Sequence, residues 1–110
     1  MSADVIRGNA VDESAASVLA LDIGTSSVRA AMFDSLGNEI DGTEARAQRA
    51  LRTTFDGGAE LDAEGAIEEV MRVVDEALAK VSAASTASIE SVAVSCFWHS
   101  LVGVDGAGRA

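Results

Sequence analysis

Residues 19–34, LALDIGTSSVRAAMFD, constrain the fold of this chain more than any other stretch. The apolar run at 18–21 is typical of a buried strand, and Asp22 follows at its end. A short polar turn comes next, and residues 28–33 then have the composition of a second strand. The pattern predicts a β-hairpin whose turn directly follows the carboxyl end of a buried strand.

The turn of this hairpin consists of Gly24, Thr25, Ser26 and Ser27. A glycine lets backbone amides approach an anion closely, and neighbouring hydroxyls add hydrogen-bond donors. A carboxylate just before such a loop, here Asp22, can hold a divalent cation directly or through water. These residues predict a phosphate-binding hairpin with a metal-positioning aspartate. Aspartate and glycine are also common in hairpin turns that bind nothing, so a purely structural turn is the alternative.

Composition limits the classes of partner. The 110 residues suffice for one modest domain, and a hydrophobic content of 48% is typical of a globular chain. A net charge of −10 argues against nucleic-acid binding and against electrostatic docking to anionic lipid. The single cysteine, Cys96, excludes an internal disulfide and fits a cytoplasmic setting. No apolar run approaches the length of a membrane span, and we expect no secretory signal.

The region after the first hairpin is predicted to add a third strand. Residues 38–53 are polar and moderately alternating, which fits a strand with one wet face. The three-residue spacing of Arg46, Arg49 and Arg52 also fits a helical turn. We interpret these arginines as a solvated face in preference to an anion site.

A glycine-containing joint at 56–58 precedes an amphipathic helix predicted over 63–82, with Asp62 as its N-cap. The apolar residues recur at the i, i+3, i+4, i+7 spacing of a helix buried on one side. They are Ile67, Val70, Met71, Val74, Leu78 and Val81. The pairs Glu68–Arg72 and Glu76–Lys80 have the favourable i, i+4 order, and each is worth about 0.2–0.5 kcal/mol.

A second apolar strand is predicted at 91–95, after a small-residue linker. Because it follows a helix, we expect it to lie parallel to the first strand through a right-handed crossover. Phe97, Trp98 and His99 come after its carboxyl end, where open α/β sheets bind ligands. The only tryptophan and the only histidine therefore lie side by side at a candidate site, although such a pair also occurs in packing or capping.

The last residues are predicted to form another hairpin arm. Residues 101–104 are apolar enough for a strand, and Asp105-Gly106-Ala107-Gly108 repeats the Asp-x-x-Gly spacing of residues 34–37. A hairpin turn without a returning strand leaves a strand edge unpaired. We therefore expect the sequence to be a piece of a longer protein.

Three segments together resemble the FGGY family of carbohydrate kinases. LALDIGTSSVRAAMFD is similar to the first phosphate motif of the superfamily of sugar kinases, actin and heat-shock chaperone ATPases. GAELDAEGAIEEVMRVVDEAL resembles the FGGY segment in which an acidic pattern precedes the first helix. SVAVSCFWHSLVGVDGAGRA resembles the strand, sugar-contacting loop and hairpin that follow, and its histidine–serine pair is most similar to gluconokinases, with xylulokinases next.

The resemblance implies an α/β fold, namely a truncated ribonuclease-H-like N-terminal domain of the actin-like ATPase superfamily. Such a domain has a mixed sheet with β-hairpins and one crossover helix. Residues 1–17 are polar, rich in small residues and without periodicity, so we expect a flexible leader there. By the resemblance, residues 18–110 would be a partial kinase domain. The implied parent activity is ATP-dependent phosphorylation of a hydroxyl of a sugar or sugar acid, gluconate or xylulose first, by a cytoplasmic protein that is able to form a homodimer. The alternative is a non-catalytic actin-like ATPase or assembly module, and the Trp98-His99-Ser100 loop argues against it.

The resemblance also assigns roles to the residues around the first turn. Asp22 would help to position the magnesium ion of Mg·ATP. Gly24, Thr25 and Ser26, with Ser27 beside them, would form the loop that faces the transferred phosphoryl group. Such a loop acts by positioning and charge stabilisation. ATP and Mg²⁺ are therefore the expected cofactors.

The sugar pocket would contain Trp98 as a flat apolar wall and His99 as a ligand of a hydroxyl or carboxylate. The catalytic base of the family is an aspartate expected beyond Ala110, and neither Asp22 nor Asp105 matches it. We therefore expect these 110 residues alone to be inactive.

Overall fold

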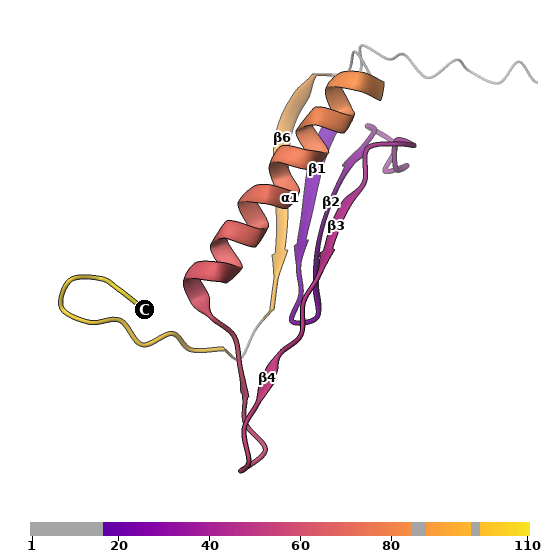
Figure 1. Ribbon diagram of the computed structural model, residues 1–110. Helices are drawn as coiled ribbons and strands as arrows, with labels where there is room; N and C mark the ends of the chain where they lie inside the picture. Colours follow the sequence, from indigo (N-terminus) through magenta and orange to yellow (C-terminus); the bar gives the residue numbers. More distant parts are fainter. Residues whose placement is uncertain (1–16, 85–87, 98–99) are drawn as a thin grey trace, which may run out of the picture.

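The computed structural model describes residues 17–84, 88–97 and 100–110 (Figure 1). One helix lies across one face of a four-stranded sheet, and a small two-stranded ribbon extends from the end of that sheet (Figure 1). In chain order the elements are β1 (Ser17–Ile23), β2 (Ser27–Phe33), β3 (Ala45–Gln48), β4 (Arg52–Thr53), β5 (Ala59–Glu60), α1 (Ala63–Ala84) and β6 (Ile89–Cys96). The expected leader lies outside the described residues except for Ser17, which begins β1.

The sheet is mixed, with the strand order β3-β2-β1-β6. β1, β2 and β3 form an antiparallel meander, and β6 pairs in parallel with β1. A parallel pair needs a crossover connection, and α1 provides it between the meander and β6. The predicted mixed α/β architecture with hairpins and one crossover helix is thus confirmed.

The hydrophobic core lies between α1 and the strands β1, β2 and β3. Alternate residues of each strand point toward the helix, as a pleated strand requires. The buried members of this core are Leu19, Val28, Ala30, Met32, Ala45, Val73, Ala77 and Val81. The register of β6 on β1 pairs Val92 with Leu19 and Val94 with Leu21, so these two valines share the helix-facing side of the sheet. Both nevertheless remain exposed.

The predicted helix exists, but its buried face differs from the predicted stripe. Val73, Ala77 and Val81 are buried, whereas Ile67 and Met71 are 65% and 57% exposed. The reason is the position of α1, which packs on β2 and β3 and leaves β6 uncovered. Three of the six predicted apolar residues, Ile67, Met71 and Leu78, therefore remain exposed and have no strand to pack against.

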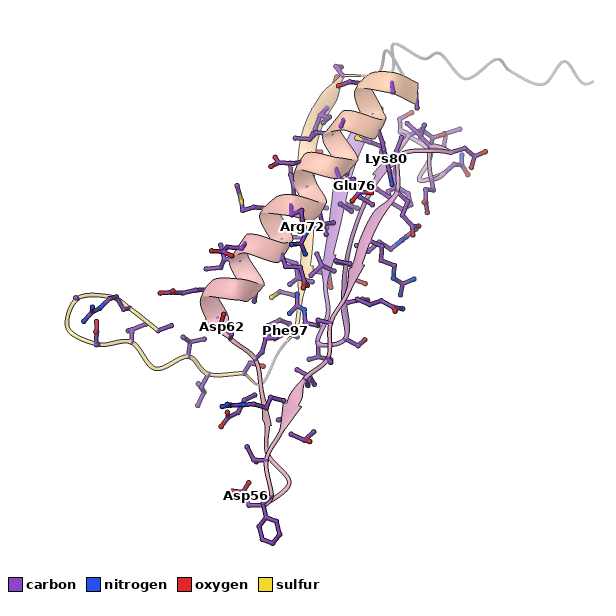
Figure 2. All side chains as sticks on the ribbon, in the orientation of Figure 1. Asp56, Asp62, Arg72, Glu76, Lys80 and Phe97 are labelled. Atoms are coloured by element: carbon purple, nitrogen blue, oxygen red, sulfur yellow. The ribbon has the colours of Figure 1, made fainter. Side chains whose placement is uncertain are left out.

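The ends and surface of α1 follow local sequence rules. Asp62 caps the helix, because its Oδ2 accepts the N–H of Gly65 at 2.8 Å. The Glu76–Lys80 ion pair forms at 2.7 Å (Figure 2). The other predicted pair, Glu68–Arg72, is not among the ion pairs formed within the described ranges.

The single third strand predicted over 38–53 is only partly correct. Residues Ala45–Gln48 pair with β2, but the chain then leaves the sheet, and β4 and β5 form a separate ribbon with a turn at 54–58. No helical turn forms at the three arginines, which lie in or beside these short strands. Pairing with β2 and β5 outweighs the local three-residue spacing.

Residues 101–104, predicted as a strand, form none. They run as an extended and exposed segment away from the sheet (Figure 1). The predicted turn after them does form, with the Asp105 carbonyl accepting the N–H of Gly108 at 2.9 Å. Strand pairing needs a partner, and the described part of the chain supplies none here.

Candidate active site at the carboxyl edge of the sheet

Three segments of the candidate site follow strands that end at the same edge of the sheet. β3 and β1 are both antiparallel to β2, and β6 is parallel to β1, so these three strands end together. The turn 24–27 follows β1, Arg49 follows β3 and Phe97 follows β6. Open α/β sheets bind ligands at this carboxyl edge.

The turn after β1 is tight. The N–H of Gly24 donates to the carbonyl of Ser27 at 2.8 Å, and a Cβ atom at position 24 would lie 3.1 Å from that oxygen. A glycine therefore fits this close approach better than a larger residue does. Thr25 and Ser26 project from the turn and are exposed, and their N–H groups make no hydrogen bond within the described part of the chain. Both remain available to an anion.

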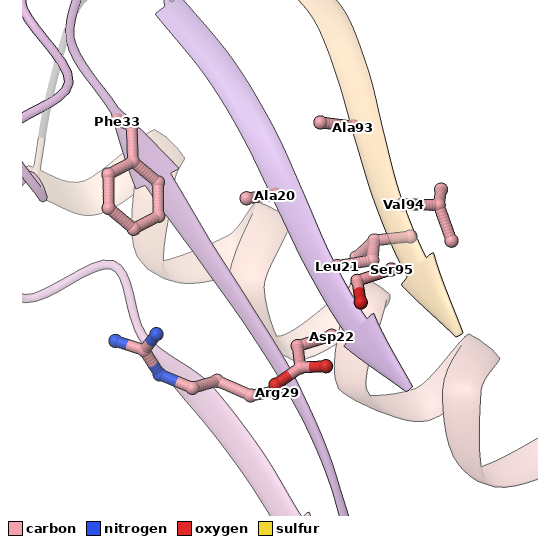
Figure 3. A pocket seen from close by; sticks show the side chains of 8 residues that line it. All are labelled: Ala20, Leu21, Asp22, Arg29, Phe33, Ala93, Val94 and Ser95. Atoms are coloured by element: carbon pink, nitrogen blue, oxygen red, sulfur yellow. The ribbon is translucent and has the colours of Figure 1, made fainter. Parts of the chain in front are cut away.

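Asp22 lies at the end of β1 on the face of the sheet opposite to α1. Its cross-strand partners are Arg29 on β2 and Ser95 on β6. All three border a shallow hollow of about 270 Å³ (Figure 3). The rest of its lining is mainly apolar, from Ala20, Leu21, Phe33, Ala93 and Val94.

Arg29, the cross-strand partner of Asp22 on β2, forms ion pairs with other carboxylates. Arg29 donates to Glu44 at 2.8 Å and to Glu39 at 2.5 Å. The hydrogen bond to Glu44, followed by that to Glu39, raises the pKa of Arg29, and Arg29 in turn lowers the pKa of the Glu44 carboxyl. Within the described residues Asp22 forms no ion pair. Its carboxylate is therefore free to face an added cation.

A single exposed carboxylate beside a turn with exposed hydroxyl and amide donors suits magnesium. Mg²⁺ keeps several of its waters and takes one or two carboxylates together with phosphate oxygens. Asp22 would provide such a ligand, and no cluster of three or more histidine, cysteine, aspartate or glutamate side chains occurs among the residues that the structure describes. One carboxylate suits a magnesium ion whose other ligands are water molecules and the phosphate oxygens of a nucleotide.

The predicted sugar-binding residues, Trp98 and His99, lie outside the described residues. The residue before them is well placed, because the N–H of Phe97 donates to the carbonyl of Ile23 at 2.9 Å. This bond joins the end of β6 to the end of β1. The chain therefore enters the predicted sugar-contacting segment next to the predicted phosphate turn.

Arg49 is the residue of this edge that the sequence-based interpretation missed. We expected a solvated side chain, but only 5% of it is exposed. Its backbone N–H donates to the carbonyl of Ser26 at 2.9 Å, and its Nε donates to Glu69 of α1 at 2.8 Å. The sequence offered no local signal for this burial, because the strand predicted over 38–53 ran past Arg49 and its partner Glu69 lies on α1.

Within the described ranges α1 is the only helix, and it does not have the long apolar stretch that a membrane-spanning helix needs.

The chain is similar to known carbohydrate kinases. The model of the N-terminal domain of the FGGY family of carbohydrate kinases matches residues 17–110. Among solved structures, gluconate kinase from Lactobacillus acidophilus superposes with a TM-score of 0.71 at 20% sequence identity. The match covers 86% of this chain and 18% of that kinase, so the chain spans less than a fifth of its length. No curated protein matches the chain.

The family match extends from β1 through the end of the chain, and the structural match independently supports the same fold. Both agree with the expected ribonuclease-H-like fold of the actin-like ATPases. The chain therefore belongs to the FGGY family of carbohydrate kinases and matches the model of its N-terminal domain.

Proposed function

We propose that the protein containing this domain transfers the γ-phosphoryl group of ATP to a hydroxyl of a sugar or sugar acid. Gluconate is the first candidate substrate and xylulose the second. The observation that carries the proposal is the family match over 17–110, which includes the turn 24–27 directly after Asp22. That turn offers exposed hydroxyl and amide donors beside a free carboxylate.

Phosphoryl transfer depends mainly on positioning and on stabilising charge. Mg²⁺ bound to ATP would neutralise charge on the phosphate oxygens. Asp22 would hold that ion in place, directly or through water. Thr25 and Ser26 would donate to oxygens of the transferred group, and the hydrogen bond between Gly24 and Ser27 keeps the turn rigid while they do so.

The sugar would lie beside this turn. Trp98 and His99 remain our proposed sugar-binding residues, supported by the direct hydrogen bond between Phe97 and Ile23. The catalytic base and the adenine site are proposed to belong to other parts of the parent protein, and we expect no transfer by these 110 residues alone. A cytoplasmic location and a homodimeric parent are further proposals.

The test uses the full-length protein encoded by the parent gene. ADP release is measured with Mg·ATP and a panel of gluconate, xylulose and glycerol. Asp22→Ala should lower kcat by about 10²–10³-fold, the usual effect of removing one transition-state stabiliser, with little change in the KM of the sugar. Asp41→Ala is the matched control, because Asp41 is an exposed aspartate in the β2–β3 connection.

Two outcomes would contradict the proposal. An unchanged kcat in Asp22→Ala would remove this residue from the metal site. ATP hydrolysis that no sugar or sugar acid stimulates would favour the alternative, a non-catalytic actin-like ATPase or assembly module.

A further inference from the structure

Arg49 has more hydrogen-bonding capacity than the protein uses. A guanidinium carries five N–H donors, and only Nε–H has a partner, the Oε1 atom of Glu69 at 2.8 Å. Both terminal nitrogens are buried and have no hydrogen-bond partner. Buried polar groups are nearly always paired, so an unpaired guanidinium edge is unusual in a folded protein.

The place of Arg49 makes this unusual feature informative. It directly follows β3, at the same edge of the sheet as the turn 24–27 and Phe97. Its backbone N–H donates to the carbonyl of Ser26, so the residue is joined to the predicted phosphate turn. Its side chain lies on the face of the sheet that α1 covers, which is opposite to the face of Asp22. There it contacts Glu69, whose side chain is 16% exposed.

The ion pair with Glu69 already balances the charge of Arg49 but leaves the planar pair of terminal nitrogens free. These two nitrogens form a fork that matches two oxygens of one carboxylate or phosphate group. Lysine would neutralise Glu69 equally well, whereas only arginine offers the second pair of donors. The unused donors therefore indicate a second acceptor beyond Glu69.

We propose that the terminal nitrogens of Arg49 form an oxyanion subsite at the carboxyl edge of the sheet. Its ligand has two adjacent oxygens on one atom, either a phosphoryl group or the carboxylate of a sugar acid. The nitrogens are covered in this structure, so binding has to open the site, and the measured affinity includes that cost. Binding of an oxyanion at Arg49 would require neither ATP, nor magnesium, nor kinase activity.

The test uses the ¹⁵N-labelled 110-residue chain without magnesium or nucleotide. The Nε–H signal of Arg49 and the thermal midpoint are followed during titration with sodium phosphate or sodium gluconate, and ionic strength is held constant with sodium chloride. Glucitol, which lacks the carboxylate, is the neutral control. We expect a saturable shift of the Arg49 signal and a rising midpoint with at least one of the two oxyanions. A response to phosphate alone assigns the subsite to a phosphoryl group, and a response to gluconate alone assigns it to a sugar-acid carboxylate.

Variants distinguish the contribution of the two terminal nitrogens of Arg49 from that of its positive charge. Arg49→Lys keeps the charge and should lose at least about tenfold in affinity, the effect of one charge-assisted hydrogen bond. The double variant Arg49→Met/Glu69→Met removes both charges of this largely buried ion pair together, which proteins often tolerate without loss of stability, and should not bind at all. Arg52→Met is the matched control, because it removes an exposed arginine of the β4–β5 ribbon.

Three results would overturn the proposal. In the first, neither oxyanion shifts the Arg49 signal of the unmodified chain. In the second, the double variant binds as well as that chain. In the third, the exposed Arg52 signal shifts as much as that of Arg49, which would show non-specific attraction of anions.

Discussion

The turns at Asp34 and Asp105 have the same internal structure in opposite surroundings. In each, the aspartate N–H donates to the carbonyl four residues later at 2.9 Å, and the glycine N–H donates to the aspartate carbonyl. In each, the aspartate Oδ1 accepts two further backbone N–H groups. Gly37 and Gly108 both have a positive φ, 83° and 78°.

The chain on either side of the two turns differs. The first turn joins paired segments, since Phe33 bridges to Glu39 and the N–H of Ile40 donates to the carbonyl of Met32. The second follows the unpaired residues 101–104, of which Leu101 is fully exposed. An Asp-x-x-Gly turn therefore forms from local hydrogen bonds, whereas the hairpin around it requires a partner strand and a covered face.

The largest expected difference between the two regions comes from their flanking apolar residues. Met32→Ala should lower the free energy of unfolding by about 2–5 kcal/mol, because Met32 is fully buried under α1. Val104→Ala, next to the second turn, should change it by less than about 0.5 kcal/mol, because Val104 is exposed. Urea denaturation of both variants measures the difference. Equal losses would show that residues 101–104 pack in solution.

A buried hydroxyl gives the first hairpin a second point of attachment. Thr43 Oγ1 accepts the N–H of Met32 at 3.1 Å and donates to the carbonyl of Ile40 at 2.7 Å. Thr43→Val keeps the shape but leaves the N–H of Met32 unpaired and leaves the Ile40 carbonyl with only the long bond from the Thr43 N–H at 3.4 Å, and should cost about 1–3 kcal/mol. Thr53→Val, at an exposed threonine of β4, is the control. If the two variants unfold at the same urea concentration, the hydroxyl contributes nothing measurable.

Matched alanine substitutions at the two turn glycines test how the stability of each turn itself contributes to the stability of the fold. Both positions have open space around them, so only the positive φ opposes a side chain. Gly37→Ala should destabilise the fold by about 1–2 kcal/mol, the cost of a left-handed conformation for an L-residue. Gly108→Ala meets the same strain, but the second turn should open without unfolding the sheet. Amide exchange at Asn38 and Arg109, read beside the urea midpoint, distinguishes local opening from global unfolding.

The smallest expected effect is on the pH dependence of stability. The backbone N–H of Asn38 lowers the pKa of Asp34, and the backbone N–H and then the guanidinium of Arg109 lower the pKa of Asp105, in both cases below the ordinary 3.8. A lowered folded-state pKa gives stabilisation that is present above the unfolded-state pKa and is lost as pH falls through the folded-state pKa. Stability should therefore decline below about pH 4. Carboxyl ¹³C NMR should show both depressed pKa values.

Aspartate-to-asparagine variants test whether the titration of each aspartate changes the free energy of unfolding. Asp34→Asn should flatten the decline in acid, whereas Asp105→Asn should leave the unfolding curve unchanged. A flattened decline in Asp105→Asn instead would mean that the second turn is coupled to the folding of the sheet.

Much of this fold could be predicted because its signals are local. The Asp62 cap, the helix after it and both Asp-x-x-Gly turns depend on residues close in sequence, and all of them form. The parallel pairing of β6 with β1 followed from the order of helix and strand. The placement of Asp22 and the turn after it at the end of β1 was equally local, although their roles remain proposals.

The errors concern packing between elements. The apolar residues Ile67 and Met71 were expected in the core, but which face of a helix is buried depends on where the helix lies over the sheet. Arg49 was interpreted, together with Arg46 and Arg52, as part of a solvated face in preference to an anion site. Its burial depends on Glu69, twenty residues away on α1.

The sequence by itself determined β1, β2, α1 and β6, their order and the turn chemistry, because propensity, capping and turn hydrogen bonds act over a few residues. The tertiary structure alone decided which side chains are buried and which strand edges are paired. Those outcomes depend on contacts between residues distant in sequence, such as α1 on β2 and β3 but not on β6. The buried guanidinium of Arg49 is a consequence of that placement, whereas residues 101–104 are unpaired because the described part of the chain supplies no partner strand.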